Sequence, residues 1–280
     1  MQAVELPEEW AGSRVAVVIP TFNEADTLPV LVKRLFALPL PGLAVIVADD
    51  DSPDGTGRIA DELAAAENRP EDGAGEERMI VLHRPRKAGI GRAYIAGMQV
   101  ALDRGFDVVV QMDSDLSHPP EAIPGMVGTL FATEAGVVIG SRYVNGGSLS
   151  EEWGRYRKFL SAWANFYVNA ILHLRINDAT GGFKAWRADV LREIDLASLR
   201  SDGYSFQVEM NYRCTRLGHV AVEVPIHFED RLAGSSKMGF AVKYESMKMP
   251  FALRRRNQGR RNEGRRNQDR RNEGRPNRVR

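Results

Sequence analysis

The segment RVAVVIPTFNEADTLPVLVKRLF, residues 14–36, sets the pattern that decides the fold. It opens with β-branched and apolar residues, Val15–Ile19, which are typical of a strand buried on both faces. The polar residues TFNE follow, and Thr27–Phe36 then has the spacing of a helix. A strand, a polar turn and a helix in this order form the repeating unit of an α/β sheet.

The same unit recurs through residues 15–140, where short apolar runs alternate with helix-like stretches. This alternation predicts one α/β domain with a mostly parallel sheet, right-handed crossovers and flanking helices. The predicted strands are Val15–Ile19, Val45–Ala48, Met79–Leu82, Val108–Gln111 and Val137–Ile139, and the predicted helices are Thr27–Phe36, Gly57–Glu67, Ala88–Leu102 and Glu121–Phe131.

The pattern is less regular from residue 141 to residue 253. Trp153–Leu174 is predicted to be a helix or a pair of helices, with most of its apolar side chains in the core. Val220–Phe228 is predicted to be a strand, and Ala241–Leu253 an amphipathic helix.

Four polar clusters follow predicted strands: TFNE after the first, DDDSPDGTG after the second, DSDLSHPP after the fourth and SRY after the fifth. Any one of them alone is an ordinary turn, because Asp, Ser, Pro and Gly are turn formers. The carboxyl ends of parallel strands share one edge, however, and ligands bind beyond that edge. Four clusters at one edge therefore predict a binding site there.

The turn Asp113-Ser114-Asp115 directly follows an apolar strand. Two neighbouring carboxylates in such a place are costly unless a cation neutralises them, although a solvated turn with two unpaired acids is the alternative. Carboxylate oxygens suit Mg²⁺ or Mn²⁺, and Mg²⁺ often bridges to the phosphates of a substrate. The turn therefore predicts a metal–diphosphate site, with Asp113 and Asp115 as the ligands.

Two familiar nucleotide-binding motifs are missing. The sequence contains no GxxxxGK[ST], so a P-loop NTPase is not supported. GIGRAYIAG, residues 89–97, is glycine-rich but is not a dinucleotide fingerprint, and we expect its glycines to serve a helix start and close packing.

The chain divides by composition into a predicted catalytic domain, 1–253, and a low-complexity tail, 254–280. The tail repeats RRNQG-like units and carries twelve Arg and three acidic residues. The net charge of the whole chain is only +1, so the predicted catalytic domain carries a net negative charge. Such a tail cannot fold by burying apolar surface and is predicted to be disordered. It could solubilise the protein or attract an anionic membrane or nucleic acid. The acidic domain argues against a nucleic-acid partner.

The sequence predicts a cytoplasmic protein lying on the cytoplasmic face of a membrane. Its one cysteine, Cys214, excludes an internal disulfide and favours a reducing compartment. The best apolar stretch, Phe159–Leu174, is shorter than a membrane span, and MQAVELPEEW has no signal-peptide character. A basic tail next to an amphipathic helix would provide a peripheral attachment.

Seven blocks, spread in order over residues 14–250, carry a family resemblance. They are PTFNE (20–24), DDDSPDGT (49–56), DSDLSHPPE (113–121), GSRY (140–143), TGGFKAW (180–186), GYSFQVEM (203–210) and VPIHFEDRLAGSSKM (224–238). Together they resemble the polyprenol-phosphate (dolichyl-phosphate) mannosyltransferases, inverting family 2 glycosyltransferases with a GT-A fold. The last block, with Arg231 and Lys237 six residues apart, narrows the resemblance to that family.

The resemblance implies transfer of mannose from GDP-mannose to polyprenyl phosphate, with Mg²⁺ or Mn²⁺. UDP-glucose as donor, or another family 2 reaction, is the alternative. Asp113, Asp115, Arg231 and Lys237 would be catalytic. The remaining implied substrate contacts are Pro20, Phe22, Glu24, Ala48 and Asp50 around the nucleotide, Ser114 at the metal turn, Arg142 on phosphate charge, and Arg157 and Ser161 on the lipid phosphate.

The chain departs from the family at Ser117, where relatives often carry a Gln that assists the metal, and the neighbouring His118 is predicted to be a structural turn residue. An acceptor phosphate is already anionic at neutral pH, so no general base is expected. Some relatives have membrane spans or depend on a separate membrane subunit. A membrane-anchoring partner is therefore among the expectations for this chain.

Overall fold

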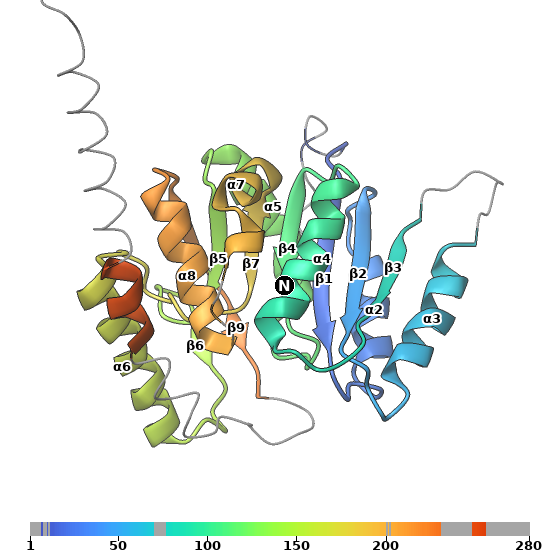
Figure 1. Ribbon diagram of the computed structural model, residues 1–280, viewed down its shortest axis with the longest axis horizontal. Helices are drawn as coiled ribbons and strands as arrows, with labels where there is room; N and C mark the ends of the chain where they lie inside the picture. Colours follow the sequence, from blue (N-terminus) through green and yellow to red (C-terminus); the bar gives the residue numbers. More distant parts are fainter. Residues whose placement is uncertain are drawn as a thin grey trace, which may run out of the picture.

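A seven-stranded sheet in the order β3-β2-β1-β4-β7-β5-β8 forms the centre of the protein (Figure 1). The computed structural model describes residues 7, 10, 12–69, 77–199, 201, 203–230 and 248–255. The strands are β1 (Val15–Thr21), β2 (Leu43–Asp49), β3 (Met79–His83), β4 (Val108–Gln111), β5 (Val137–Ser141), β7 (Lys184–Arg187) and β8 (Ala221–Pro225), and β6 (Ser148–Leu149) pairs with β9 (His227–Phe228) in a second, small sheet.

Helices cover both faces of the large sheet, which confirms the predicted α/β architecture. One core holds buried side chains of α2, α3 and α5, and the other holds those of α4, α6, α7 and α8. The helices are α2 (Leu28–Phe36), α3 (Thr56–Glu67), α4 (Ile90–Asp103), α5 (Ile123–Ala132), α6 (Arg155–Leu172), α7 (Ala188–Ile194) and α8 (Gly203–Arg216), with short 3₁₀ turns at Pro120–Ala122 and Leu196–Ser198.

The opening segment forms the strand and helix that its sequence predicts. Every residue of β1 is buried, as a central parallel strand requires. Helix α2 buries Leu28, Leu31, Val32 and Leu35, which recur at helical spacing on the face toward the sheet.

The glycines of GIGRAYIAG have the structural roles predicted for them. Gly89 has φ 98°, which glycine adopts without strain, and it precedes the first residue of α4. At Gly97 a Cβ would lie 2.4 Å from a methyl carbon of Val18, so the missing side chain lets α4 pack directly on β1.

Strand β7 was not predicted from the sequence. It runs antiparallel between β4 and β5, whereas the other neighbouring strands of the large sheet run parallel. The predicted strand Val220–Phe228 is in fact two, because Ile226 interrupts it: β8 joins β5, and β9 joins β6. The insertion of β7 places the turn before it, residues 180–183, at the edge where the parallel strands end.

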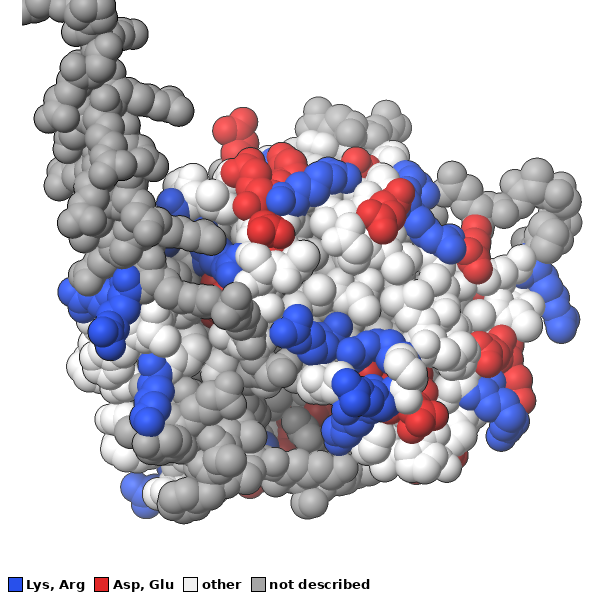
Figure 2. Space-filling model, in the orientation of Figure 1, with Lys and Arg blue, Asp and Glu red and all other residues white. Residues whose placement is uncertain are grey.

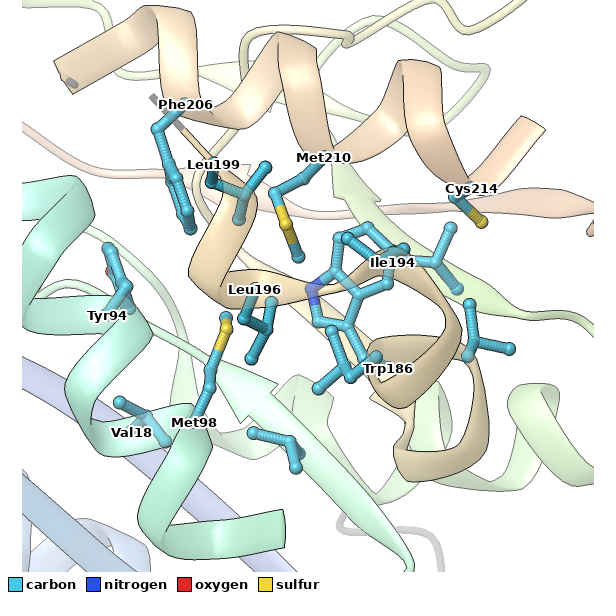
Figure 3. Close-up of a cluster of buried hydrophobic side chains, with 14 of the residues drawn as sticks. Val18, Tyr94, Met98, Trp186, Ile194, Leu196, Leu199, Phe206, Met210 and Cys214 are labelled. Carbon is cyan, nitrogen blue, oxygen red and sulfur yellow. The ribbon is translucent and has the colours of Figure 1, made fainter. Parts of the chain in front are cut away.

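Trp186 of β7 lies at the centre of the core between α4 and α8 (Figure 3). A buried polar network lies beside it: Lys184 Nζ donates to the side-chain oxygen of Gln207 at 2.9 Å, and Gln111 Nε2 donates to the same oxygen at 2.7 Å. Lys184 is fully buried, and burial lowers its pKa to about 7.

The pKa of Lys184 should make stability depend on pH. Unfolded lysine titrates near 10.5, so between about pH 7 and pH 10 the unfolded chain binds more protons than the folded chain. The free energy of unfolding should therefore rise with pH in this window, by up to about 1.4 kcal/mol per pH unit from this group. Urea unfolding at pH 7 and pH 9 measures the rise, which should be smaller in Lys184→Met. Equal pH dependence in the two proteins would contradict the prediction.

Helix α6 differs from its predicted role as a core helix. It buries only Asn165, Val168 and Leu172, and its large aromatic side chains other than the half-buried Tyr167 are exposed. A helix at the edge of the molecule contacts its neighbours along one stripe, and here that stripe is the less aromatic one.

The C-terminal part of the chain is described only over residues 248–255, which are helical and bury Met249 and Leu253. The remainder of the predicted helix Ala241–Leu253 and almost all of the tail 254–280 lie outside the described residues, so the predicted division of the chain at residue 253 stays a prediction. Among the described residues, no helix combines the length and the apolar character needed to cross a membrane.

Candidate active site at the carboxyl edge of the sheet

The polar clusters predicted to share one edge do so. Strands β1, β2, β4 and β5 run in the same direction and end at TFNE, at Asp49–Ser52, at the DSD turn and at Arg142 respectively. β7 starts at that edge, since it is antiparallel to β4 and β5. The candidate site is therefore built at the strand ends, where α/β proteins bind ligands.

The ends of β1 and β2 bring together several of the residues expected around a nucleotide. Pro20 and Ala48 are direct partners in the sheet, and both are buried. Thr21 Oγ1 donates to Asp49 Oδ1 at 2.9 Å, and Ser52 Oγ donates to the same oxygen at 2.6 Å. Asp49 therefore fixes the turn.

Phe22 and Glu24 lie half-buried on the loop after β1. Lys87 Nζ stands 3.7 Å from the centre of the Phe22 ring, and Thr27 Oγ1 donates to Glu24 Oε2 at 2.8 Å. The Lys87 ammonium over the Phe22 ring and the Glu24 carboxylate nearby place a positive and a negative group at this end of the sheet edge.

Asp50 is buried, and its carboxylate is already held by the protein. Arg84 forms an ion pair with it, and the amide of Ala88 donates to it at 3.2 Å. Asp50 therefore connects the end of β2 to the loop before α4. A ligand that binds Asp50 would bind a carboxylate that Arg84 and Ala88 already orient.

Within the DSD turn, Asp115 is held by hydrogen bonds from a neighbouring residue of the same turn. Leu116 has φ 63°, a left-handed conformation that turns the chain back, and Ser117 donates to Asp115 Oδ1 from its amide at 3.1 Å and from its hydroxyl at 2.5 Å. Asp115 and Ser114 are both nearly buried. Ser117 thus orients an acid of the turn.

Asp113 is oriented by a residue that the sequence did not single out. Tyr94 of α4 is fully buried, and its hydroxyl donates to Asp113 Oδ1 at 2.6 Å. Burial, and then the charge of Asp113, raises the pKa of Tyr94 well above its usual value, so the phenol keeps its proton.

His118 has the structural role predicted for it. The amide of Asp113 donates to His118 Nδ1 at 3.2 Å, and the ring stacks on Phe183 at 5.1 Å. Burial lowers the pKa of His118 despite the nearby carboxylates. A neutral ring that accepts at Nδ1 serves the turn and leaves the two acids as the charged groups.

The donor set of the DSD turn fits a divalent ion. Two carboxylates, each fixed by a hydroxyl donor, are hard oxygen ligands of the kind that Mg²⁺ and Mn²⁺ take together with phosphate oxygens and water. The described residues contain no group of three or more His, Cys, Asp or Glu side chains that could hold a metal ion, so the two acids would need further ligands from a substrate and water.

Arg142, at the end of β5, is bound by a buried acid. Its Nε and Nη2 donate to the two oxygens of Asp178 at 2.7 Å each, and its amide donates to Asp178 at 3.0 Å. Asp178 is fully buried, and its own amide donates to Glu223 at 2.8 Å. This bidentate geometry fixes the plane of the guanidinium group.

Arg157 and Ser161 lie one helical turn apart on α6, half-buried. The Arg157 guanidinium stands 3.9 Å from the centre of the Trp153 ring, and its Nη1 lies 3.3 Å from Asp230. The Ser161 hydroxyl lies near the phenol of Tyr143 but not in hydrogen-bonding geometry, and burial raises the pKa of that phenol.

Aromatic rings connect the two arginines to the acidic turn. Phe228 lies 5.4 Å from His118, 5.6 Å from Trp153 and 5.2 Å from the Arg142 guanidinium. Among the described residues, two buried donors beside these arginines, Tyr143 Oη and Trp153 Nε1, have no hydrogen-bond partner. Buried polar atoms are normally satisfied, so an orphan pair here marks a place for a ligand or water.

Arg231 and Lys237, the remaining residues expected to be catalytic, lie outside the described residues. Sequence reasoning missed Tyr94, Trp153 and Asp178. Tyr94 stands inside GIGRAYIAG and Asp178 two residues before the TGGFKAW block, so nearness to a motif was the available signal.

Comparison with known proteins identifies the family. The pattern of "Glycosyl transferase family 2" matches residues 16–195, which include the DSD turn, Arg142 and the β7 block. The chain belongs to glycosyl transferase family 2. This glycosyltransferase is 45% identical to "Undecaprenyl-phosphate mannosyltransferase" of Micrococcus luteus over 234 residues. The aligned region covers 84% of this chain and 91% of the relative. It is 43% identical over 236 residues to "Polyprenol monophosphomannose synthase" of Mycolicibacterium smegmatis, covering 84% of each.

Solved structures confirm the GT-A-like fold of the glycosyltransferase. Glucosyl-3-phosphoglycerate synthase from Mycobacterium tuberculosis, in complex with Mn²⁺, UDP-glucose and phosphoglyceric acid, matches with a TM-score of 0.63 and 19% identity, covering 87% of this chain and 80% of that one. Mannosyl-3-phosphoglycerate synthase from Rubrobacter xylanophilus matches with a TM-score of 0.61 and 19% identity, covering 90% and 77%. At this identity the likeness concerns the fold.

Proposed function

We propose that this glycosyltransferase transfers mannose from GDP-mannose to a polyprenyl phosphate and inverts the anomeric centre. The observation that carries the proposal is the arrangement of charge: the acidic DSD turn and the arginines Arg142 and Arg157 lie around one aromatic cluster. A donor diphosphate with its cation and an acceptor phosphate need that combination. The names of the two relatives, each over 40% identical, supply the sugar and the lipid class.

On the donor side, Asp113 and Asp115 would hold Mg²⁺ or Mn²⁺ and, through it, the diphosphate, with Ser114 lining the turn. A bound divalent ion would supply charge neutralisation for the departing GDP. Pro20, Phe22, Glu24, Ala48 and Asp50 would line the nucleotide site. Arg231 and Lys237 would offset phosphate charge, as the family resemblance implies.

On the acceptor side, Arg142, Arg157 and Ser161 would receive the lipid phosphate. Trp153 Nε1 and Tyr143 Oη, which are buried without hydrogen-bond partners among the described residues, would be further donors to it. A phosphate has enough oxygen acceptors for all of these groups, and binding it would satisfy both orphan atoms.

The chemistry requires no catalytic base. One oxygen of the acceptor phosphate forms a bond to the anomeric carbon of mannose, and the bond from that carbon to the GDP oxygen breaks with its electron pair staying on GDP. The phosphate monoester is ionised at neutral pH, so no proton has to be removed. Fixed arginines hold the two anions in line against their repulsion.

A sugar-transfer assay tests the function directly. Purified protein with Mg²⁺ or Mn²⁺ is given radiolabelled GDP-mannose and polyprenyl phosphate, and labelled lipid is extracted. Unlabelled UDP-glucose, added in competition, tests the alternative donor. The proposal fails if label moves only from UDP-glucose or only to a saccharide hydroxyl.

Tyr94→Phe should weaken metal binding without disturbing the fold. The phenylalanine keeps the stack on Phe206, whose ring centre lies 6.0 Å away, but loses the hydroxyl that orients Asp113. Removing a residue that hydrogen-bonds to a metal ligand typically lowers metal affinity about 10–100-fold. The Mn²⁺ concentration for half-maximal transfer should rise by about that factor. The control is Tyr156→Phe, which removes an exposed phenol. An unchanged metal titration in Tyr94→Phe would count against the assignment.

Trp153→Phe should weaken acceptor binding selectively. The smaller ring keeps contact with Phe228 and Arg157 and loses only the indole N–H. A hydrogen bond to a charged phosphate contributes about 1.5–3 kcal/mol, so the KM for polyprenyl phosphate should rise about tenfold or more. The KM for GDP-mannose should stay the same. A rise in the donor KM alone would place Trp153 on the other side of the site.

The protein would work at the cytoplasmic face of a membrane, to which it would attach peripherally, because its acceptor is a lipid. Twelve Arg in residues 254–280 would add attraction to anionic headgroups, and a separate membrane subunit would be a further anchor. Vesicle sedimentation at increasing salt tests the tail, since binding that ignores salt would rule out an electrostatic attachment.

A further inference from the structure

One peptide group beside Arg142 is held from two sides by asparagines of different helices. Asn211, on α8, donates from its Nδ2 to the carbonyl oxygen of Ala179 at 2.9 Å. The amide of Thr180 donates to Oδ1 of Asn165, on α6, at 3.1 Å. Thr180 directly follows Ala179, so the carbonyl and the N–H belong to the same peptide group. The two asparagines and this peptide group are here called the asparagine clamp.

The clamp is buried, and each asparagine keeps one polar atom unsatisfied. Asn165 is 4% exposed and Asn211 is fully buried. Among the described residues, Asn165 Nδ2 and Asn211 Oδ1 have no hydrogen-bond partner. An amide atom buried in this way costs free energy, which an apolar side chain of similar size would avoid. Packing alone therefore does not account for two asparagines at these positions.

The residues on either side of the clamped peptide bond both bind Arg142. Asp178, directly before Ala179, accepts from Arg142 Nε and Nη2 at 2.7 Å each. Thr180 Oγ1 accepts from the same Nη2 at 3.3 Å. Figure 2 shows many Lys and Arg side chains standing on the surface, whereas only 9% of the Arg142 side chain is exposed. The orientation of this buried guanidinium group therefore depends on a three-residue segment that the clamp holds in the middle.

Helix α8 gives the clamp a firm attachment to the central sheet. Gln207 lies one helical turn before Asn211, and its side-chain oxygen accepts from Lys184 of β7 and from Gln111 of β4. Both Gln207 and Asn211 are buried. Because α8 is bonded to two neighbouring strands, Asn211 can hold the Ala179 carbonyl in a fixed place relative to the sheet.

Helix α6 carries the other half of the clamp on the same side as two proposed acceptor residues. Arg157, Ser161 and Asn165 are spaced four residues apart, so their side chains follow one another along one face of the helix. Asn165 therefore connects the helix that carries Arg157 and Ser161 to the segment that orients Arg142.

We infer that Asn165 and Asn211 are positioning residues of the transfer reaction, which fix the 179–180 peptide group and thereby the place of Arg142 relative to Arg157 and Ser161. The inference rests on the proposed function, in which these three residues receive the acceptor phosphate. The clamp acts through Arg142, so its loss should affect the acceptor and not the sugar donor.

Kinetics of Asn165→Leu test the inference. Leucine has a similar size but cannot accept from the Thr180 amide. The KM for polyprenyl phosphate should rise about tenfold, as expected when a buried donor loses its partner and Arg142 is less well held. The KM for GDP-mannose should stay the same. Asn211→Leu, which strands the Ala179 carbonyl instead, should give the same pattern. An unchanged acceptor KM in both variants would overturn the inference.

Asn169→Leu is the matched control for a general loosening of α6. Asn169 lies one turn after Asn165, and it bonds both backbone groups of Ile176, at 3.1 Å and 2.5 Å. Its loss should lower the free energy of unfolding, which urea unfolding measures, but should leave the acceptor KM unchanged, because Ile176 does not bind Arg142. Equal rises of the acceptor KM in Asn165→Leu and Asn169→Leu would assign a merely structural role to both.

Two variants of Thr180 test the link to Arg142 and keep the inference falsifiable if an asparagine variant fails to fold. Thr180→Val keeps the clamped amide but loses the hydroxyl that accepts from Arg142, so the acceptor KM should rise. Thr180→Ser keeps the hydroxyl and should resemble the wild type. In Asn165→Leu/Thr180→Val the combined effect should be smaller than the product of the single effects, because both act through one guanidinium group. Fully independent effects, or equal effects of valine and serine, would contradict the inference.

Nuclear magnetic resonance separates the inference from the proposed function. The Nε–H signal of Arg142 is recorded in ¹⁵N-labelled protein without substrates and is assigned by its absence in Arg142→Met. Its exchange with water should be about tenfold faster in Asn165→Leu, and unchanged in Asn169→Leu. Unchanged exchange in Asn165→Leu would overturn the inference. If the exchange responds as expected but the wild type transfers mannose to no lipid phosphate, the proposed function fails and the control of Arg142 by the clamp stands.

Discussion

Asp115→Ala should reduce mannose transfer by about a thousandfold or more, because it removes one of the two acids proposed to hold the metal and the leaving diphosphate. Such a loss corresponds to about 4 kcal/mol of transition-state stabilisation, within the range that a metal ion supplies. The measurement is label transfer from GDP-mannose with saturating Mn²⁺, together with Mn²⁺–GDP binding by calorimetry, which should weaken in parallel.

The variant should still fold. Asp115 accepts hydrogen bonds from the amide and the hydroxyl of Ser117, and losing these two bonds should cost about 1–2 kcal/mol. Asp26→Ala removes an exposed acid from the loop after β1 and is the control for charge at this edge. Ordinary activity in Asp115→Ala would refute the metal assignment, whereas equal loss in both variants would show a general electrostatic effect.

Asp178→Asn should cost about 3 kcal/mol or more of the free energy of unfolding. The carboxylate accepts three hydrogen bonds from Arg142, and both side chains are almost fully buried. Removing one partner of a buried ion pair leaves the other charge uncompensated, which is among the costliest single changes in a protein. Urea unfolding near neutral pH gives the value directly.

The double variant Asp178→Asn/Arg142→Met makes this test specific. If the loss comes from the stranded guanidinium, replacing Arg142 by an uncharged chain should recover part of the stability. Transfer should nevertheless fall in both variants, because Arg142 is either displaced or absent. A single variant within about 0.5 kcal/mol of the wild type would show that the pair contributes little to stability.

The sequence predicts the candidate site well where the chain order alone decides it. The acids of the DSD turn and the polar loop after β1 follow apolar runs directly, so their place at the sheet edge depends only on recognising the strands. The same local logic predicted that Gly97 packs closely and that His118 serves the turn.

Other parts of the site depend on residues that are far apart in the chain. Tyr94 reaches Asp113 across 19 positions, and Asp178 reaches Arg142 across 36. The sequence shows each of these residues but not its partner. Arg142 was expected to act on phosphate, and the structure adds that a buried carboxylate fixes its orientation.

The amino-acid sequence by itself determined the alternating strands and helices, the edge on which polar residues collect and the family to which the chain belongs, because apolar spacing and short motifs are local. Only the tertiary structure decided that β7 inserts antiparallel between β4 and β5, that Trp153 buries a donor with no partner in the described part of the chain, and that α6 turns its aromatic row outward. These features depend on which distant surfaces pack together. The energy of that packing is shared between segments, so no single segment of sequence reveals it.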